Sequence, residues 1–212
     1  LTLMAFFQIW QLHPSPAESR IEQAAQNKGN LDSKKIEQLL AHHPAYYYLP
    51  YLYSKYLIEK KHAQYQKILE LLKHSIYLCP SYYPAYLLAG NMFHRLRKFQ
   101  NAVTAWKMAI RNKPVLIVSI LDKLTASPKI NQQEILAIIP PENKTALKLF
   151  SQYWLRKKTK TFCPQILDNL SSFQPQEADI LLTRLDMEHF CLSTANPSLI
   201  KQISSLKGVP QR

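Results

Sequence analysis

The stretch that decides the fold is AYLLAGNMFHRLRKFQNAVTAWKMAIRNKP, which occupies residues 85–114. In its first half apolar residues recur at helical spacing, and the small Ala89 and Gly90 leave room for a neighbouring helix. In its second half Ala102 and Ala109 are the matching small positions, and Trp106 between them is large enough to fill the space. The proline at 114 follows the last apolar position and is a helix stop signal. The stretch therefore predicts two helices that pack closely as a hairpin.

This hairpin resembles a tetratricopeptide repeat (TPR), a unit of about 34 residues with the pattern W-x2-L-G-x2-Y…A-x3-F…P. The matching positions are Tyr86, Ala89, Gly90, Phe93, Ala102, Trp106, Ala109 and Pro114. The resemblance implies a right-handed superhelix of stacked hairpins, in which the first helix of each hairpin faces a concave, peptide-binding groove.

The spacing of prolines extends this pattern toward the N-terminus. Prolines at 14, 44, 80 and 114 are 30, 36 and 34 residues apart, which is typical of a helical solenoid. Residues 44–80 form a looser unit, in which Pro50 replaces the expected glycine, and residues 15–44 form a degenerate one. We predict an all-α, right-handed TPR-like solenoid: an apolar segment at 1–14, repeats at 15–116 and divergent helical hairpins at 117–212.

The charge of the chain favours an anionic partner. Basic residues outnumber acidic residues by 27 to 14, and residues 43–161 alone carry 19 basic and 5 acidic residues. Between Glu70 and Asp122 there are seven basic residues and no acidic one. Such a surface attracts an acidic peptide, nucleic acid, or an anionic lipid or sugar. The alternative is a basic surface that is merely solvated.

No motif in the sequence indicates catalysis, a cofactor or a metal site. The three glycines, at 29, 90 and 208, are too far apart for a phosphate-binding loop. The histidines form no HExxH motif, the cysteines form no CxxC pair, and no serine is flanked by glycines as in a nucleophile elbow. We therefore expect a protein that is not an enzyme.

The three cysteines, Cys79, Cys163 and Cys191, are too few for a disulfide framework. We interpret them as reduced, buried side chains, which is the common state of isolated cysteines. One disulfide with a leftover thiol is the alternative.

Two lines of side chains are candidates for a binding groove. Tyr46 and Tyr53 take core positions of the repeat, which turns other tyrosines of the same helix onto the adjacent face. Large, rigid, amphipathic tyrosine suits an interface. At the equivalent positions of the next unit, Asn91 contributes an amide and Arg95 contributes a guanidinium. The predicted groove residues are Tyr47, Tyr51 and Lys55 in the first unit and Leu87, Asn91 and Arg95 in the second.

The order of the segments that follow the repeat is similar to the TPR tails of bacterial membrane proteins of the O-antigen ligase and polymerase type. The similarity lies in Val115-Leu116, then Ile139-Pro140-Pro141, then Trp154-Leu155. In that family the tail follows the last membrane helix, and the catalytic residues lie in the membrane domain. The uncharged residues 1–12 are consistent with the stub of such a helix or with an ordinary amphipathic helix.

Together these features predict a non-catalytic protein–protein interaction module, with a protein or peptide partner that is acidic. The family resemblance implies the soluble domain of a membrane-linked protein of the bacterial envelope, located in the periplasm, with a cytoplasmic location as the alternative. The alternative function is a basic helical-repeat protein that binds nucleic acid or an anionic surface. No recognised nucleic-acid motif supports nucleic acid as the partner.

Overall fold

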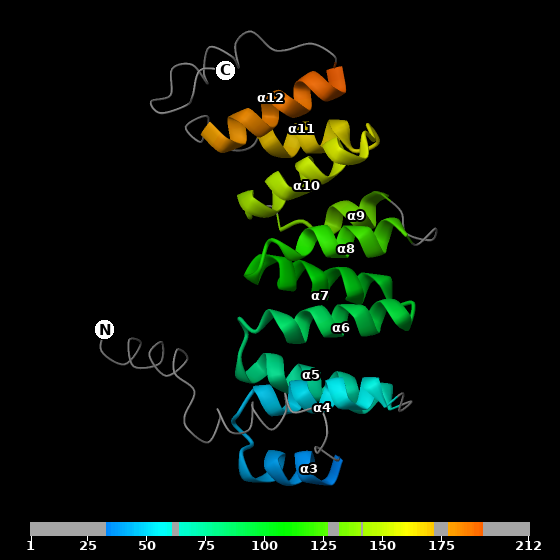
Figure 1. Ribbon diagram of the computed structural model, residues 1–212, viewed down its shortest axis with the longest axis vertical. Coiled ribbons are helices and arrows are strands. Elements are labelled where there is room, and N and C mark those ends of the chain that lie inside the picture. Colours follow the sequence, from blue (N-terminus) through cyan, green and yellow to red (C-terminus); the bar gives the residue numbers. More distant parts are fainter. Residues whose placement is uncertain (1–32, 61–63, 127–131, 141, 172–177, 193–212) are drawn as a thin grey trace, which may run out of the picture. The chain divides into compact units, whose positions relative to one another are not determined.

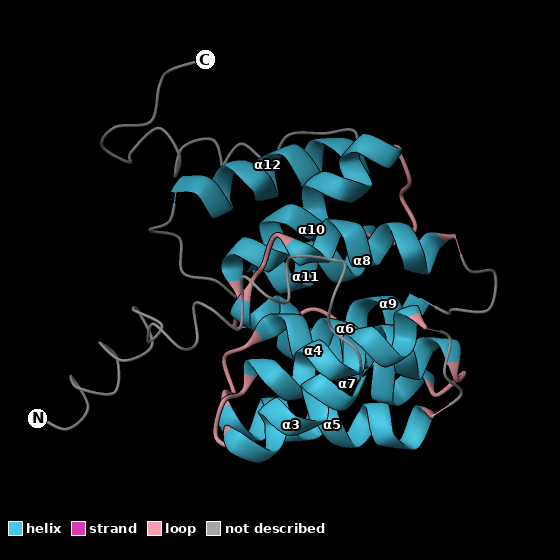
Figure 2. Ribbon diagram, turned by 60° about the horizontal axis from the view of Figure 1, so that its bottom comes forward, coloured by secondary structure: helices cyan, strands magenta, loops and turns pink. Residues whose placement is uncertain are grey.

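The computed structural model describes residues 33–60, 64–126, 132–140, 142–171 and 178–192, and these residues are helical without any strand (Figure 2). They divide into two compact units, Leu1–Pro80 and Ser81–Arg212. The predicted segment 1–14, residues 15–32 of the unit 15–44 and residues 193–212 of the divergent region lie outside the described residues.

The first unit contains α3 (Ser33–His42), α4 (Tyr48–Glu59) and α5 (Tyr65–Leu78). Helices α4 and α5 pack as a hairpin, and α3 packs on α4. The buried side chains include Leu49, Tyr53, Ile68 and Leu72. Tyr46, which the sequence also predicts in the core, is only half-buried, because it precedes the start of α4. Ser75 is also buried, and its hydroxyl donates a hydrogen bond of 2.8 Å to the carbonyl of Tyr47.

Pro50 lies in the first turn of α4. Proline has no backbone N–H, but the first turn of a helix has no intrahelical acceptor for that group. The helix therefore begins at Tyr48, only two residues before the proline, and tolerates it.

The second unit contains seven of the described helices. They are α6 (Tyr83–Arg95), α7 (Phe99–Asn112), α8 (Leu116–Thr125), α9 (Gln132–Ala137), α10 (Lys144–Lys157), α11 (Cys163–Ser171) and α12 (Ala178–Leu192). Each helix of the pairs α6–α7 and α10–α11 packs against its partner. Helix α8 packs on α10, α10 packs on α12, and α7 packs on α9. First and second helices of successive hairpins thus form two adjoining layers.

The α6–α7 hairpin has the close approach that the sequence predicts. Gly90 packs against the indole of Trp106, and a Cβ at position 90 would lie 2.6 Å from the indole nitrogen. Trp106 is 1% exposed, and Ala102 and Ala109 on either side of it are buried.

Side-chain hydrogen bonds repeat at a nearly constant separation along the second unit. Five bonds between two side chains join residues 30 to 32 positions apart: Tyr83 to Lys113, Asn91 to Lys123, Arg111 to Glu142, Asp122 to Tyr153, and Lys148 to Asp179. The first of them lies within the α6–α7 hairpin, and the other four join successive hairpins. Bonds at one repeat length are expected where each hairpin stacks on the next. The prediction of an all-α, TPR-like repeat fold is confirmed for the described residues.

The interpretation of the cysteines as three reduced thiols is wrong. Cys163 and Cys191 form a disulfide, and Cys79 is a buried thiol outside that disulfide. The pairing arises because α11 begins where α12 ends, which brings two cysteines 28 residues apart in sequence to a Cα–Cα distance of 5.7 Å.

Candidate peptide-binding face

The three predicted groove residues of the first unit lie on one face of α4. Tyr47 directly precedes the helix, and Tyr51 and Lys55 follow at intervals of one turn. The two tyrosines are half-buried, whereas Lys55 is exposed and forms a 4.0 Å ion pair with Glu59. The Tyr51 ring packs 6.0 Å from that of Tyr48, so neighbouring rings support this aromatic surface.

The three predicted residues of the second unit lie on one face of α6. Leu87 and Asn91 are half-buried, and Arg95 at the end of the helix is exposed. Helical spacing of four residues stacks these side chains along the helix. Each set of three thus shares a helix face, and its role in binding stays a prediction. The two sets belong to different units, so their joint groove stays a prediction.

Sequence reasoning missed Lys123 as a neighbour of this face. Its ammonium donates a 3.0 Å hydrogen bond from α8 to the side-chain carbonyl oxygen of Asn91 on α6. The signal was present in the sequence, because Lys123 is 32 residues after Asn91, close to one repeat. The face of α6 thus continues onto the first helix of the following hairpin.

Tyr153 of α10 joins the first helix of its hairpin to α8, the first helix of the preceding hairpin. Its hydroxyl donates a 2.9 Å hydrogen bond to the carboxylate of Asp122 and lies 3.2 Å from the hydroxyl of Thr125. Burial is the main cause that raises the pKa of Tyr153 above its ordinary value, and the nearby Asp122 adds to it. Tyr153 therefore stays protonated and serves as a donor that joins α8 to α10.

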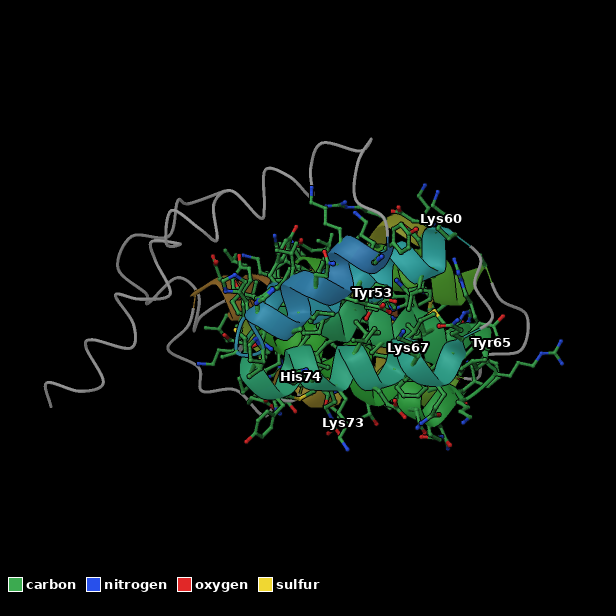
Figure 3. All side chains as sticks on the ribbon, turned by 90° about the horizontal axis from the view of Figure 1, so that it is seen from below. Tyr53, Lys60, Tyr65, Lys67, Lys73 and His74 are labelled. Atoms are coloured by element: carbon green, nitrogen blue, oxygen red, sulfur yellow. A yellow bond between two sulfur atoms is a disulfide. The ribbon has the colours of Figure 1, made fainter. Side chains whose placement is uncertain are left out.

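A polar cluster in the first unit ties α3 to the α4–α5 hairpin. The Lys67 ammonium lies 3.0 Å from the Glu37 carboxylate and 3.1 Å from the Tyr53 hydroxyl, which itself donates to Glu37. Figure 3 shows the Tyr53 and Lys67 side chains next to each other, and the ammonium also lies 4.8 Å from the centre of the Tyr53 ring.

The pKa shifts in this cluster favour a permanent ion pair. The Tyr53 hydrogen bond, followed by that of Lys67, lowers the pKa of Glu37, and hydrogen bonds to Tyr53 and Glu37 raise the pKa of Lys67. Burial raises the pKa of Tyr53. We call this cluster, which joins α3 to the α4–α5 hairpin, the clamp.

Among the described residues, no group of three or more histidine, cysteine, aspartate or glutamate side chains could hold a metal ion. In the same part of the chain, no helix has the length and hydropathy that a membrane span requires.

No protein-family model and no curated protein sequence matches the chain. Among solved structures, the chain is similar to YrrB, described as a TPR protein with an unusual peptide-binding site. The two are 13% identical, and the match covers 80% of this chain and 89% of YrrB with a TM-score of 0.39. The assignment of helical hairpins rests on the helix pairing, the Gly90–Trp106 contact and the repeating hydrogen bonds described above.

Proposed function

We propose that this chain is a non-catalytic, TPR-like interaction module that holds an extended, acidic peptide against the first helices of its hairpins. The observation that carries the proposal is the bond between Asn91 on α6 and Lys123 on α8. It fixes an amide and an ammonium side by side on neighbouring first helices, on the face that the repeat pattern assigns to the groove.

The chemistry of this pair suits a peptide backbone with acidic side chains. Asn91 accepts from Lys123 through its carbonyl oxygen, which leaves its amide N–H groups to donate to a peptide carbonyl. The Lys123 ammonium has three donors, and the exposed guanidinium of Arg95 can grip a carboxylate with two parallel hydrogen bonds. The acid-free stretch between Glu70 and Asp122 supports the same preference.

In the first unit, the tyrosines of α4 offer an apolar face of their own to such a peptide. Tyr47 and Tyr51 keep part of their surface accessible while neighbouring rings hold them in place. Ordering a rigid aromatic side chain costs little conformational entropy on binding, which is why tyrosine is frequent at interfaces.

We also propose a location in the bacterial envelope, in the periplasm, for a membrane-linked protein. The disulfide between Cys163 and Cys191 supports this location, because disulfides persist in oxidising compartments and are rare in the cytosol. The link to a membrane through sequence upstream of residue 1 remains part of the proposal.

The function can be tested with random dodecapeptides displayed on phage and selected on the whole protein. We expect enrichment of peptides with several aspartate or glutamate residues. Fluorescence anisotropy with the enriched peptides should show at least tenfold weaker binding for Tyr51→Ala and for Arg95→Ala, with unchanged helicity by circular dichroism. Testing the two variants separately examines each unit by itself.

A matched control removes one tyrosine and one cation from α5, the second helix of its hairpin, which does not carry the proposed face. Tyr77 on α5 is 81% exposed, and Figure 3 shows Lys73 of the same helix pointing away from the ribbon. Tyr77→Ala with Lys73→Ala should bind the peptides as the wild type does. Equal binding by the Tyr51→Ala, Arg95→Ala double variant would overturn the proposed face, and enrichment of basic peptides would overturn the acidic preference.

A further inference from the structure

Two turns of the second unit concentrate positive charge at one edge. The α6–α7 turn and the α10–α11 turn lie at the same ends of their hairpins, on the right of the view in Figure 1. Six exposed cations there form what we call the basic edge: Arg97, Lys98, Arg156, Lys157, Lys158 and Lys160. We propose that the basic edge is a second interaction surface, separate from the peptide face, which binds the headgroups of an anionic lipid bilayer.

Both turns hold a cation in a conformation that favours glycine. Arg97 has φ 57° and Lys158 has φ 52°, in the left-handed region. Each follows the end of a helix in a Schellman arrangement: the Lys98 amide donates to the Phe93 carbonyl at 2.9 Å, and the Thr159 amide to the Trp154 carbonyl at 3.4 Å. A long cationic side chain stands at both positions, although glycine would avoid the backbone strain.

Local carboxylates do not neutralise the basic edge. The sequence has no acidic residue between Glu70 and Asp122, nor between Glu142 and Asp168. Within the described residues, the ion pairs of the second unit involve none of the six cations. A cation at a helix C-terminus is favourable by itself, but this effect falls off within the last turn. It does not account for the charges beyond the helix ends at both turns.

The aromatic side chains near these turns argue against single-stranded nucleic acid. Such ligands are held by bases that stack on exposed rings. Here Phe99 packs against His94 with ring centres 5.7 Å apart, and Phe162 is buried against Phe150 and Trp154. Phe162 belongs to the core and Phe99 and Phe190 are half-buried, whereas the cations of the turns are exposed.

An exposed apolar side chain beside the second turn favours a bilayer. Leu192 at the end of α12 is 60% exposed. The disulfide of the preceding Cys191 fixes this helix end to Cys163, three residues after Lys160. Lys160 itself lies 5.7 Å from the centre of the Phe190 ring. Cations around an apolar side chain are the combination that binds at a membrane interface.

The proposal can be tested by flotation of the whole protein with lipid vesicles. The probes are vesicles of phosphatidylcholine alone and of phosphatidylcholine with one-third phosphatidylglycerol. We expect binding to the anionic vesicles at low salt and its loss at about 0.5 M salt, where the Debye length is below about 5 Å. Arg97→Gly with Lys158→Gly should weaken binding about 25-fold, because each cation near an anionic surface contributes about a factor of five.

This double variant is protected against misfolding, because glycine is the residue that both backbone positions favour. The matched control, Lys113→Gln with Lys144→Gln, removes the same charge from the opposite ends of the helices and should lose less than threefold. Equal binding to neutral vesicles, or equal losses in both double variants, would overturn the proposal. So would tighter binding to a single-stranded oligonucleotide that depends on Arg97 and Lys158.

The two proposed surfaces can fail independently. The glycine double variant should keep the peptide binding that depends on Tyr51 and Arg95. Failure of vesicle binding with intact peptide binding would therefore overturn the basic edge alone.

Discussion

The hairpins α4–α5 and α6–α7 occupy equivalent places in the repeat pattern but solve helix packing in different ways. In α6–α7, Gly90 has no side chain, and the large Trp106 fills the space beside it. In α4–α5 the corresponding side chains are Ser54 and Leu72, both buried: Ser54, like Gly90, lies five residues before the end of the first helix, and Leu72, like Trp106, lies seven residues after the start of the second. The prediction that Pro50 takes the glycine position is therefore wrong; Pro50 lies one turn earlier, and its carbonyl accepts a hydrogen bond of 2.8 Å from the Ser54 hydroxyl. One hairpin thus pairs glycine with tryptophan, and the other pairs serine with leucine.

The first helices of the two hairpins begin in a similar way. Helix α4 has 12 residues with Pro50 in its first turn, and α6 has 13 residues with Pro84 in its first turn. Proline is tolerated there because the first turn of a helix has no intrahelical acceptor for the missing N–H. The two hairpins therefore differ in the packing pair rather than in the start of the first helix.

The largest effect should come from removing the ring that α6–α7 depends on. Trp106→Ala should destabilise the second unit by about 3–5 kcal/mol, the usual cost for a fully buried tryptophan. Leu72→Ala should fall near the low end of about 2–5 kcal/mol, because removal of the smaller side chain leaves a smaller cavity. Chemical denaturation followed by circular dichroism measures both. A larger loss for Leu72→Ala would contradict the contrast between the hairpins.

The next largest effect should come from reducing the disulfide, which stabilises only the second unit. It closes a loop of 28 residues, for which a stabilisation of about 2–4 kcal/mol is typical. Reductant should therefore raise hydrogen exchange in α10–α12 while leaving α4–α5 unchanged. The Cys163→Ser, Cys191→Ser variant should not respond to reductant, and an equal response of wild type and variant would show that the disulfide has no such role.

Alanine at Gly90 and at Pro50 compares the packing pair of α6–α7 with a position outside the packing pair of α4–α5. Gly90→Ala should cost about 1–3 kcal/mol, because its Cβ overlaps the Trp106 indole. Pro50→Ala should cost about 0.4–1 kcal/mol, through the greater freedom of the unfolded chain. Melting temperatures of the two variants check this order, and an unchanged melting temperature for Gly90→Ala would argue against the close approach.

The smallest effect should be the pH response of the clamp in the first unit. Glu37 has a folded pKa below its ordinary value of 4.5, so its contribution is present above 4.5 and is lost as the pH falls through the lowered pKa. Hydrogen exchange in α3 should rise in that acidic window. Glu37→Gln should remove the response, whereas Glu70→Gln, on the same unit, should keep it. A response that persists in Glu37→Gln would assign it to another group.

The parts of the fold that sequence predicted are those governed by local spacing. Gly90 and Trp106 define a hairpin because helical periodicity fixes which side chains face the partner helix. The pairing of Cys163 with Cys191 could not be read in this way, because it depends on where two helices of a divergent region meet. Lys123 lay within reach of prediction, since adding one repeat length to Asn91 points to it.

For the candidate site, too, the sequence predicts only the features that local spacing governs. Positions along one helix, such as Tyr51 and Lys55, follow from spacing alone, and the structure places them as expected. The start of α4 was not predicted, because the effect of Pro50 depends on its place within the first turn. A groove shared by both units depends on how successive hairpins stack, which no local pattern determines.

The burial of the tryptophans gives the protein an optical reporter of its own. Trp106 and Trp154 both lie in the second unit, are nearly inaccessible, and have indole nitrogens without a hydrogen-bond partner among the described residues. Residues 33–80 contain no tryptophan. Because indole emission moves to longer wavelength when water reaches the ring, opening of the second unit in a Trp10→Phe variant should produce a red shift, with no tryptophan left in the first unit. Comparing this shift with the loss of helical ellipticity would show whether the two units unfold together.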